Sequence, residues 1–516
     1  MKNLDVPLFS YVINILNNIE KEFPVQSWRA FDFCVWPMLR NQIGLEIIKK
    51  GLDHPNKPQK GNEDSRIRRV LSFPISLGNS FIQTKKASFL DRIHNEAPKT
   101  AQVLFLGLNL ERQLQLSDNR RMDVHCDLIV EKLNLRGITT RYFEWNPLHR
   151  YLFPRYGNTK FIQDRIDWSK VLGMIRYQLN SHQCPNFNDY NKLREQLRTQ
   201  YCITNIPSIQ YWQSYFFFIN ELSCYFQREI INSKVRIGFV ADYASSAGMA
   251  FVLACRRNGI PSVDIQHGAA GDSNHHYGGW SCIPPNGFEV LPSFFWCWSE
   301  DEALSINNWS HNASEFHRPL VGGNPYLAYW NENKHDNIFE HSHDRLNPTH
   351  ITKNILLALQ FEVCIPEHVL ALFKKSPSNW KWWIRHHPCS TNQERNSIED
   401  LLLSQGSHLI YDIHYANELP VVALLDIMDI VVTQWSAIIL EAKNMGVKSV
   451  LTHTFGRDLF QKEIDSGFAI LALDTETLKE IIDDTSKKSI YDKGKAINDS
   501  KLMEQAIDKL VKEYLP

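Results

Sequence analysis

The sequence predicts an α/β protein built from two parallel-sheet domains. One series of alternating strands and helices runs over residues 96–315, and a second runs over residues 350–490. Strands that alternate with helices indicate a parallel sheet covered on both faces. The length of 516 residues also exceeds what one hydrophobic core normally organises. Residues 316–349, rich in Asn, His and Pro, are therefore predicted to be a linker between the two domains.

Residues 1–95 are predicted to form a helical N-terminal extension. Apolar residues recur at helical spacing in "LFSYVINILNNIEKEF" and again around "FCVWPMLRNQIGLEIIKK". The polar stretch that follows, "GLDHPNKPQKGNEDSRIRR", has the composition of an exposed loop, and its basic residues are expected to be a solvated surface.

The first sheet domain begins with a buried strand, "AQVLFLGLN", that ends in a glycine-containing loop. Its best-defined unit is "KVRIGFVADYASSAGMAFVLACRRNGIPSVDIQHG". This stretch predicts a strand over Val235–Val240, a helix over Ser245–Asn258 that stops at Gly259, and a strand over Ser262–Ile265. One more short strand is predicted over Phe294–Ser299.

The second sheet domain repeats the pattern. Strands are predicted in "ITKNILLALQ", "WKWWIRHHP", "DIVVTQWS" and "VKSVLTHT", with a helix after Pro366 and another in "LPVVALLDIM". The helix "SAIILEAKNMG" is predicted to be capped by Ser436 and ended by Gly446. Residues 491–516 predict a C-terminal helix that crosses back to the first domain.

Bulk composition excludes several classes of protein. A formal net charge of −1 gives the protein no overall positive potential that would attract nucleic acid, so no nucleic-acid partner is expected. No stretch offers the ~18 consecutive apolar residues of a membrane span, and Asp5 and Pro7 interrupt the N-terminal segment where a signal peptide would be apolar. The 10 cysteines include no C-x-x-C pair, which favours reduced thiols and a cytoplasmic protein.

Polar residues gather where the predicted strands end. Ligands of parallel sheets bind beyond the carboxyl ends of the strands, so these positions are candidate site residues. In the first domain they are Asp242, Gln266, His267 and Gly268, and in the second Gln360, Arg385, His387, Pro388 and Ser436.

The helix predicted from Ser436 is the clearest candidate for a phosphate site, because free amides and the positive end of the helix dipole favour an anion. Glu441, five residues further on, can accept hydrogen bonds from ribose hydroxyls. Arg385 and His387 suit a phosphate ester or diphosphate, and Pro388 fixes the turn that follows them.

Other ligand classes find less support. The chain has no Asp-x-Asp, no G-x-x-x-x-G-K-[ST] loop and no G-x-G-x-x-G fingerprint. It therefore lacks the main motifs of metal-dependent sugar transfer, ATP hydrolysis and NAD chemistry. A zinc site in the His-rich loop is disfavoured, because His275 and His276 are adjacent and have poor ligands beside them. Neither a metal nor a cofactor is expected.

Taken in order, Gln266-His267-Gly268, His387-Pro388 and Ser436 resemble motifs of GT-B glycosyltransferases. The "QHG" triplet is similar to the signature of bacterial capsule and lipopolysaccharide transferases that use CMP-Kdo, and "HP" with a downstream Ser occurs in the wider group of CMP-nonulosonate transferases. The resemblance covers roughly Val235–Phe468, and "VGGNP" in the predicted linker also fits it. The acidic Asp/Glu-Asp/Glu-Gly motif of sialyltransferases is absent.

The resemblance implies a GT-B-like fold, in which two Rossmann-like domains face a central cleft. Residues 96–315 would hold the acceptor and residues 350–490 the nucleotide sugar. The implied activity is metal-independent transfer of Kdo or another nonulosonic acid from its CMP donor to a growing bacterial surface polysaccharide. The acceptor would be a glycan or lipid-linked glycan, and the protein would be cytoplasmic, with peripheral contact with the inner membrane or an assembly complex left open.

Transfer from such a donor requires a carboxylate near the anomeric carbon, as base or as nucleophile. Asp242 is the first candidate for it, and Asp264 and Glu111 are alternatives. His267 could donate to the sugar carboxylate or to the leaving phosphate, while His387 and Ser436 would hold that phosphate and Glu441 the ribose.

Two other interpretations stay open on the sequence. A GT-B transferase could use a UDP-sugar, a GDP-sugar or a CDP-polyol donor. The chain could also be a non-catalytic GT-B-like scaffold in polysaccharide assembly.

Overall fold

The computed structural model describes residues 7–52, 100–112, 114–115, 120–146, 152–180, 187, 189–333, 350–360, 363–388, 390–485 and 493–515. The chain divides into two compact units. The first holds Ser10–Asn324 and Leu502–Pro516, and the second holds Pro325–Lys501 with Asp5–Phe9. The predicted basic loop that follows the N-terminal helices lies outside the described residues.

The N-terminal segment is helical, as predicted. Helix α1 (Leu8–Glu22) and helix α2 (Trp36–Leu52) are joined by a short 3-10 turn, η1 (Val25–Ser27), and by an antiparallel pair, β1 (Arg29–Ala30) and β2 (Phe33–Cys34). From Ser10 onward these helices are part of the first unit, and their apolar residues share one core cluster with helices α7 (Ile209–Ser233) and α8 (Ser246–Arg257).

The first unit contains a seven-stranded parallel sheet in the order β11-β10-β9-β8-β3-β6-β7. Numbered along the chain, the order is 7-6-5-4-1-2-3, which is the Rossmann order with one added edge strand. The chain reverses direction across the sheet between β3 and β8, so that pair marks the topological switch point. The strands are β3 (Val103–Leu108), β6 (Thr140–Trp145), β7 (Thr159–Phe161), β8 (Ile237–Ala241), β9 (Ser262–Ile265), β10 (Phe294–Cys297) and β11 (Arg318–Val321).

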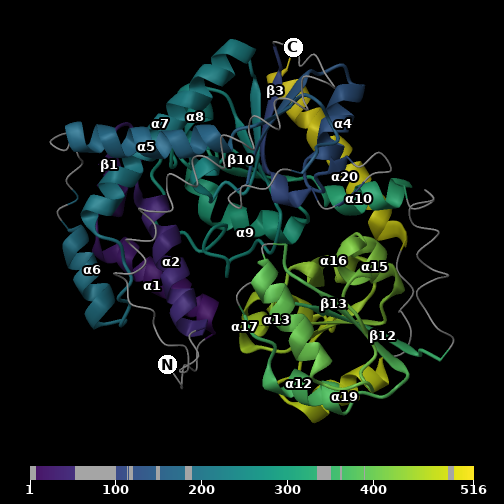
Figure 1. The fold of residues 1–516 in the computed structure, drawn as a ribbon. Coiled ribbons are helices and arrows are strands. Elements are labelled where there is room, and N and C mark those ends of the chain that lie inside the picture. The colour runs from purple at the N-terminus through teal and green to yellow at the C-terminus, as the bar shows by residue number, and fades with distance from the viewer. Residues whose placement is uncertain are drawn as a thin grey trace. The chain divides into compact units, whose positions relative to one another are not determined.

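Helices cover both faces of this sheet. Helices α7 and α8 lie on one side, and α4 (Asp127–Leu135) and the last turns of α20 (Lys493–Tyr514) lie on the other (Figure 1). Helix α5 (Gln163–Leu179) packs along α7, and the remaining helices of the unit are α6 (Tyr190–Thr199) and α9 (Glu300–Ser310). Short elements η2 (Asn109–Glu111), β4 (Leu114–Gln115), β5 (Arg121–Met122) and η4 (His311–Ala313) fill the connections.

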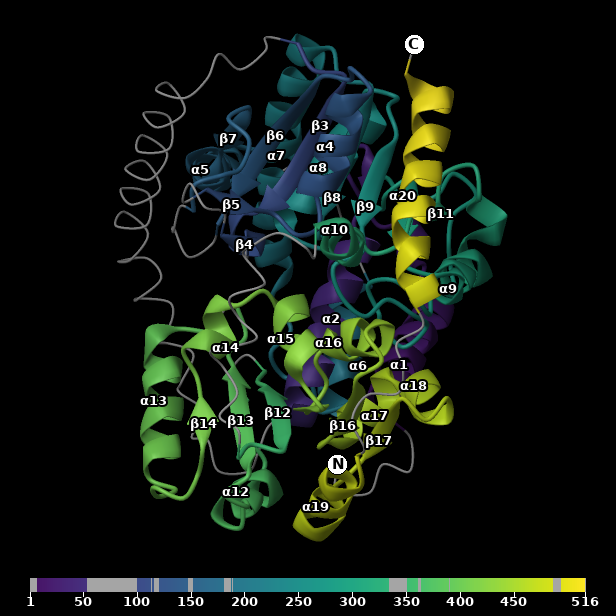
Figure 2. The same ribbon diagram turned by 90° about the vertical axis from the view of Figure 1, so that its right-hand side faces the viewer.

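The second unit contains a six-stranded parallel sheet in the order β14-β13-β12-β15-β16-β17. Along the chain this is the order 3-2-1-4-5-6, and its switch point lies between β12 and β15. Figure 2 shows this sheet from a second side. Its strands are β12 (Lys353–Ala358), β13 (Trp380–Arg385), β14 (Tyr411–Asp412), β15 (Ile430–Thr433), β16 (Lys448–Leu451) and β17 (Ala469–Leu471).

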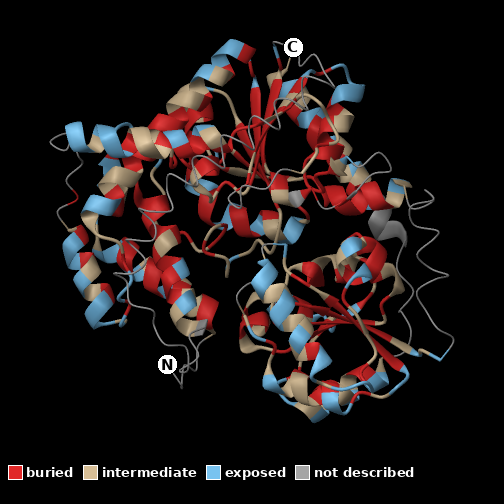
Figure 3. Ribbon diagram, viewed as in Figure 1, coloured by how far each residue is buried: buried red, intermediate tan, exposed pale blue. Residues whose placement is uncertain are grey.

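In this unit α12 (Glu367–Lys374) and α19 (Thr475–Asp484) pack together on one face, and α15 (Val421–Ile427) and α16 (Ile438–Asn444) lie on the other (Figure 1). Both sheets are buried, whereas the outer faces of the helices carry the exposed residues (Figure 3). The other helices are α10 (Pro325–Asn333), α13 (Asn392–Leu403), α14 (Tyr415–Glu418), α17 (Thr454–Leu459) and α18 (Gln461–Asp465).

The predicted fold class is confirmed: the chain carries two Rossmann-like parallel-sheet units and a helical N-terminal segment, the domain content of a GT-B-like protein. The predicted cleft between the two domains stays a prediction. Local sequence signals explain why the predicted bounds of α8 agree with the structure. Ser245 caps this helix by accepting from Gly248 N at 3.0 Å, and Gly259 (φ +64°) follows the end of the helix.

Two details of the sequence prediction are wrong. The segment predicted as a linker contains β11, which pairs with β10 and extends the first sheet to Val321, and it also contains α10. The helix predicted to be capped by Ser436 begins at Ile438 instead, because Ser436 N donates to Thr433 Oγ1 at 3.3 Å and this turn delays the helix. Ser436 Oγ still accepts from Ile438 N, at 3.4 Å.

Candidate functional site

Asp242 stands at the switch point of the first unit, directly after β8. It is half-buried and its backbone is left-handed, with φ +69°. Few residues other than glycine adopt this conformation, although Asp and Asn tolerate it best, and such strain clusters at functional sites. The turn is fixed by Ser245, whose hydroxyl donates to the carbonyl oxygen of Asp242 at 2.9 Å. The backbone thus presents a partly accessible carboxylate at the predicted strand end.

The alternative carboxylates have different surroundings. Asp264 lies inside β9, is 1% exposed, and accepts from Tyr243 N at 2.9 Å. Burial raises its pKa well above the ordinary value, and the charge of Asp242 adds to that rise. Asp264 therefore supports the turn that carries Asp242. Glu111 ends η2 after strand β3, and its side chain lies outside the described residues.

Gln266 is buried and fully engaged with the backbone. Its Nε2 donates to Gly268 O at 2.9 Å, and its Oε1 accepts from Trp298 N at 2.8 Å. The side chain therefore ties the loop after β9 to the end of β10, and its predicted role in binding stays a prediction. Gly268 borders open space where a side chain would begin, so a ligand could approach the backbone there.

His267 follows Gln266 and is half-buried. Its Nδ1 is buried and has no hydrogen-bond partner among the residues that the structure describes. The ring lies 6.3 Å from the ring of His125, centre to centre, in an edge-on arrangement. Burial lowers the pKa of the neighbouring His276 to about 3, and the charges of Arg40 and His267 add to this effect. A neutral His276 therefore accompanies His267 at physiological pH.

The sequence did not predict His125 or Arg40 for this site. His125 precedes α4 and Arg40 lies on α2, so both reach the end of β9 from distant segments. The only local signal was a His beside two aspartates in "DVHCD", a pattern that is too common to single out a site.

A buried ion network lies at the adjacent strand ends. Arg112 is completely buried and contacts Asp127 (Nη1 to Oδ2, 3.0 Å) and Glu144 (Nε to Oε1, 2.6 Å). Asp127 Oδ2 also accepts from Asp123 N at 2.9 Å, which joins Asp123 to the network, and Asp123 Oδ2 accepts from Tyr142 Oη at 2.7 Å. Asp127 and Glu144 thus share one guanidinium, and the charge of Asp123 lies close by. Burial therefore raises the pKa of Asp127 to about 7 despite Arg112.

This raised pKa predicts a stability loss with rising pH. Folded Asp127 holds its proton up to about pH 7, whereas in the unfolded chain it releases it near pH 4. Because the folded state then binds more protons, the stability that Asp127 contributes is greatest below about pH 4 and declines until about pH 7. Denaturant unfolding of wild type and Asp127→Asn over pH 4–8 checks this. The wild type should lose stability relative to the variant, and parallel curves would refute the assignment.

The switch point of the second unit brings predicted residues together. Thr433, the last residue of β15, donates from Oγ1 to Ala358 O at 2.8 Å and so joins β15 to β12. Gln360 Nε2 lies 3.5 Å from the same Oγ1, and Ser436 N donates to it at 3.3 Å. Gln360 and Ser436 therefore meet at one threonine hydroxyl, at the edge where such sheets bind ligands.

Arg385 and Glu441 lie beside this switch point. Arg385 ends β13, and one terminal nitrogen donates to Ala416 O at 2.7 Å and Leu419 O at 2.8 Å. Burial lowers the pKa of Arg385, and the charges of Tyr326 and Glu441 counter this. Glu441 is thus an electrostatic partner of Arg385, a role that the sequence did not predict.

The "HHP" segment after β13 separates into buried and accessible parts. His386 is buried, its backbone N–H donates to Asn417 Oδ1 at 2.9 Å, and burial lowers its pKa to about 4. His387 is half-buried and Pro388 is exposed, in a turn where Ser390 N donates to His387 O at 2.9 Å. His387 is therefore the more accessible of the two imidazoles, and its predicted role in binding phosphate stays a prediction.

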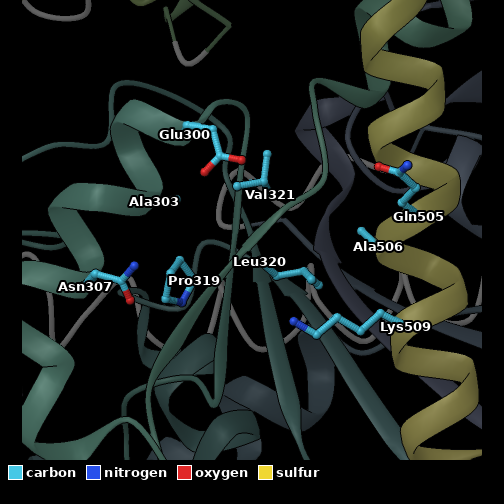
Figure 4. Close-up of a pocket in the computed structure, with 9 residues that line it drawn as sticks. All are labelled: Glu300, Ala303, Asn307, Pro319, Leu320, Val321, Gln505, Ala506 and Lys509. Atoms are coloured by element: carbon cyan, nitrogen blue, oxygen red, sulfur yellow. The ribbon is translucent and has the colours of Figure 1, made fainter.

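A cavity of about 290 Å³ lies elsewhere, between α9, β11 and α20 (Figure 4). It is lined by Glu300, Ala303, Asn307, Pro319, Leu320, Val321, Gln505, Ala506 and Lys509. Pro319 has no N–H to offer on this sheet edge, which protects the edge from pairing with another strand. The cavity contains none of the predicted site residues, so we place the candidate site at the strand ends.

Two features are absent from the described ranges. No group of three or more His, Cys, Asp or Glu side chains there could hold a metal ion. No helix in the described part of the chain is long and apolar enough to cross a membrane.

Comparisons with known proteins identify no family. No protein-family model matches the sequence, and no curated protein is significantly similar to it. Among solved structures, UDP-GlcNAc 2-epimerase from Neisseria meningitidis bound to UDP-GlcNAc aligns with 80% of this chain and 100% of its own, at 14% identity and a TM-score of 0.47. MurG from Acinetobacter baumannii aligns with 80% of this chain and 98% of its own, at 11% identity and a TM-score of 0.37. Similarities at this level assign no activity to the chain.

Proposed function

We propose that the chain is a glycosyltransferase that transfers Kdo or another nonulosonic acid from its CMP donor to a bacterial surface glycan. The observation that carries this proposal is the position of Asp242 and His267, which stand at the ends of neighbouring strands beside a Rossmann switch point. The order of the motifs QHG, HP and Ser supports the choice of donor.

The second unit would bind the nucleotide. Its switch point offers the side-chain amide of Gln360 and the hydroxyl of Ser436, both of them neutral hydrogen-bonding groups held beside Thr433. His387 lies at the neighbouring strand end and would contact the CMP phosphate, with Pro388 shaping its turn. Glu441, an electrostatic neighbour of Arg385, would hold the ribose through its carboxylate oxygens.

The first unit would carry the acceptor and the reacting carboxylate. The transition state of sugar transfer is oxocarbenium-like, and a carboxylate stabilises it as a base or as a nucleophile. Asp242 could act as the base of an inverting reaction or as the nucleophile of a retaining one, so the proposal covers both configurations at the anomeric carbon. His267, with an unpartnered Nδ1 among the described residues, would bind the sugar carboxylate or the departing phosphate. The proposed reaction needs no metal or cofactor, because imidazoles and amides meet the charge of the phosphate.

Nucleotide-dependent stabilisation tests this proposal. CMP at ~100 times its dissociation constant should stabilise the fold by about 2.7 kcal/mol and raise the melting temperature, equally with magnesium and with EDTA. UDP, GDP and CDP serve as matched ligands in the same measurement. A response to UDP or GDP alone would overturn the CMP donor, and no response to any nucleotide would favour the scaffold alternative.

A further inference from the structure

The His-rich loop, Gly268–Ser281, packs against the two N-terminal helices. Arg40 on α2 and Glu20 on α1 form an ion pair (Nε to Oε1, 3.0 Å) whose two side chains are completely buried. We refer to this pair as the N-terminal clamp. A buried ion pair is costly unless further hydrogen bonds satisfy its remaining donors and acceptors. Here the loop supplies them.

Arg40 donates to three carbonyl oxygens of the loop. They belong to His275, Gly278 (3.2 Å) and Gly279 (2.9 Å), and the guanidinium carbon also lies 4.0 Å from the centre of the Trp280 ring. Glu20 holds the end of the loop, since its Oε2 accepts from both the backbone N and the hydroxyl of Ser281, at 2.8 and 2.6 Å. The clamp therefore bonds the loop at four residues.

Two glycines let the loop and the helices approach closely. A Cβ at Gly44 of α2 would lie only 2.7 Å from His275 Nε2, and a Cβ at Gly279 would lie 2.6 Å from Ile13 of α1. Gly279 also has φ +66°, a conformation that favours glycine. The close contact between the loop and the N-terminal helices therefore depends on these two glycines as well as on the buried ion pair.

The opposite side of the loop meets the candidate site. The Tyr243 hydroxyl donates to the carbonyl oxygen of His276, and Tyr243 directly follows Asp242. Asn274 Nδ2 donates to Ala269 O at 2.6 Å, which connects the clamped part of the loop to the segment after His267. A displacement of the loop at Arg40 would therefore move the surroundings of both proposed reacting residues.

We propose that Glu20 and Arg40 are positioning residues, which hold the His-rich loop so that His267 and His276 face the reacting groups beside Asp242. This inference rests on the proposed transferase function, because it assigns the N-terminal helices a part in that same site. It extends the site to residues more than 200 positions earlier in the sequence, where no site residue was expected.

Two variants test the clamp. Arg40→Lys keeps one positive charge but cannot reach three carbonyls, and Gly44→Ala places a methyl group against His275 without removing any charge. Ala favours the helix more than Gly does, so Gly44→Ala should fold even if the loss of Arg40 is not tolerated. Leu45→Ala, at an exposed position of the same helix, is the matched control.

Both variants should lower kcat by about 10- to 100-fold, as a misplacement of about 1 Å does, while KM for the donor and the affinity for CMP stay unchanged. Hydrogen exchange of the amides of residues 268–281 should be faster than in wild type, and that of the second unit should be unchanged. Leu45→Ala should match wild type in every measurement.

The two proposals fail in different ways. Loss of kcat with an unchanged exchange rate in the loop, or faster exchange with an unchanged kcat, would overturn the positioning role. If wild type transfers no sugar, the proposed function fails. An unchanged loop exchange in both variants would then also overturn the clamp, whatever the protein binds.

Discussion

Replacing Asp242 with Asn is expected to lower the rate of sugar transfer about a thousandfold, since a positioned base or nucleophile contributes two to four orders of magnitude. Asn has the same shape and is among the few residues that tolerate the left-handed backbone found here (φ +69°). The variant should therefore fold normally. The measurement is the initial rate of transfer, followed by CMP release, beside a titration with CMP.

CMP affinity should be unchanged in Asp242→Asn, because the nucleotide is assigned to the second unit. Asp301→Asn, at an exposed position of α9, is a suitable control and should retain wild-type activity. If Asp242→Asn transferred sugar at more than a tenth of the wild-type rate, Asp242 could not be the reacting carboxylate, and Glu111 would be the next candidate.

Replacing Arg112 with Ala is expected to destabilise the first unit by about 3–5 kcal/mol, the usual cost of removing one partner of a buried ion pair. Arg112 is completely buried, and its loss leaves Asp127 and Glu144 without their guanidinium. Because the chain has two units, unfolding should be followed with a probe that resolves the first unit, such as hydrogen exchange of its strands.

Arg198→Ala provides the contrast for that experiment. Arg198 forms an ion pair with Glu195 on α6, and both side chains are about 60% exposed (61% and 59%). Exposed pairs contribute little to stability, so this variant should unfold like wild type. Equal effects of the two substitutions would mean that the Arg112 network does not stabilise the fold.

Strand and helix positions could be predicted because their signals are local. The continuous apolar runs of β3, β8 and β12 and the Ser245 cap of α8 depend only on neighbouring residues. The carboxyl ends of parallel strands meet at one edge of a sheet. Asp242 and His267 could therefore be predicted to lie in a common region.

The rest of the site depends on long-range contacts that no local pattern reveals. Gln266 bonds to the backbone of Trp298, and Arg40 bonds to a loop 235 to 239 residues later in the chain. The start of α16 was misplaced for a similar reason, since the Thr433 hydroxyl belongs to the preceding strand and holds Ser436 out of the helix.

The most direct test of the account is the release of CMP from CMP-Kdo by the wild-type protein in the presence of a bacterial surface glycan acceptor, with UDP- and GDP-sugars assayed alongside. The account predicts CMP release that depends on the acceptor and persists in EDTA. Nucleotide release from a UDP- or GDP-sugar alone would contradict the proposed donor, and no release from any donor would contradict the proposal that the chain is a glycosyltransferase.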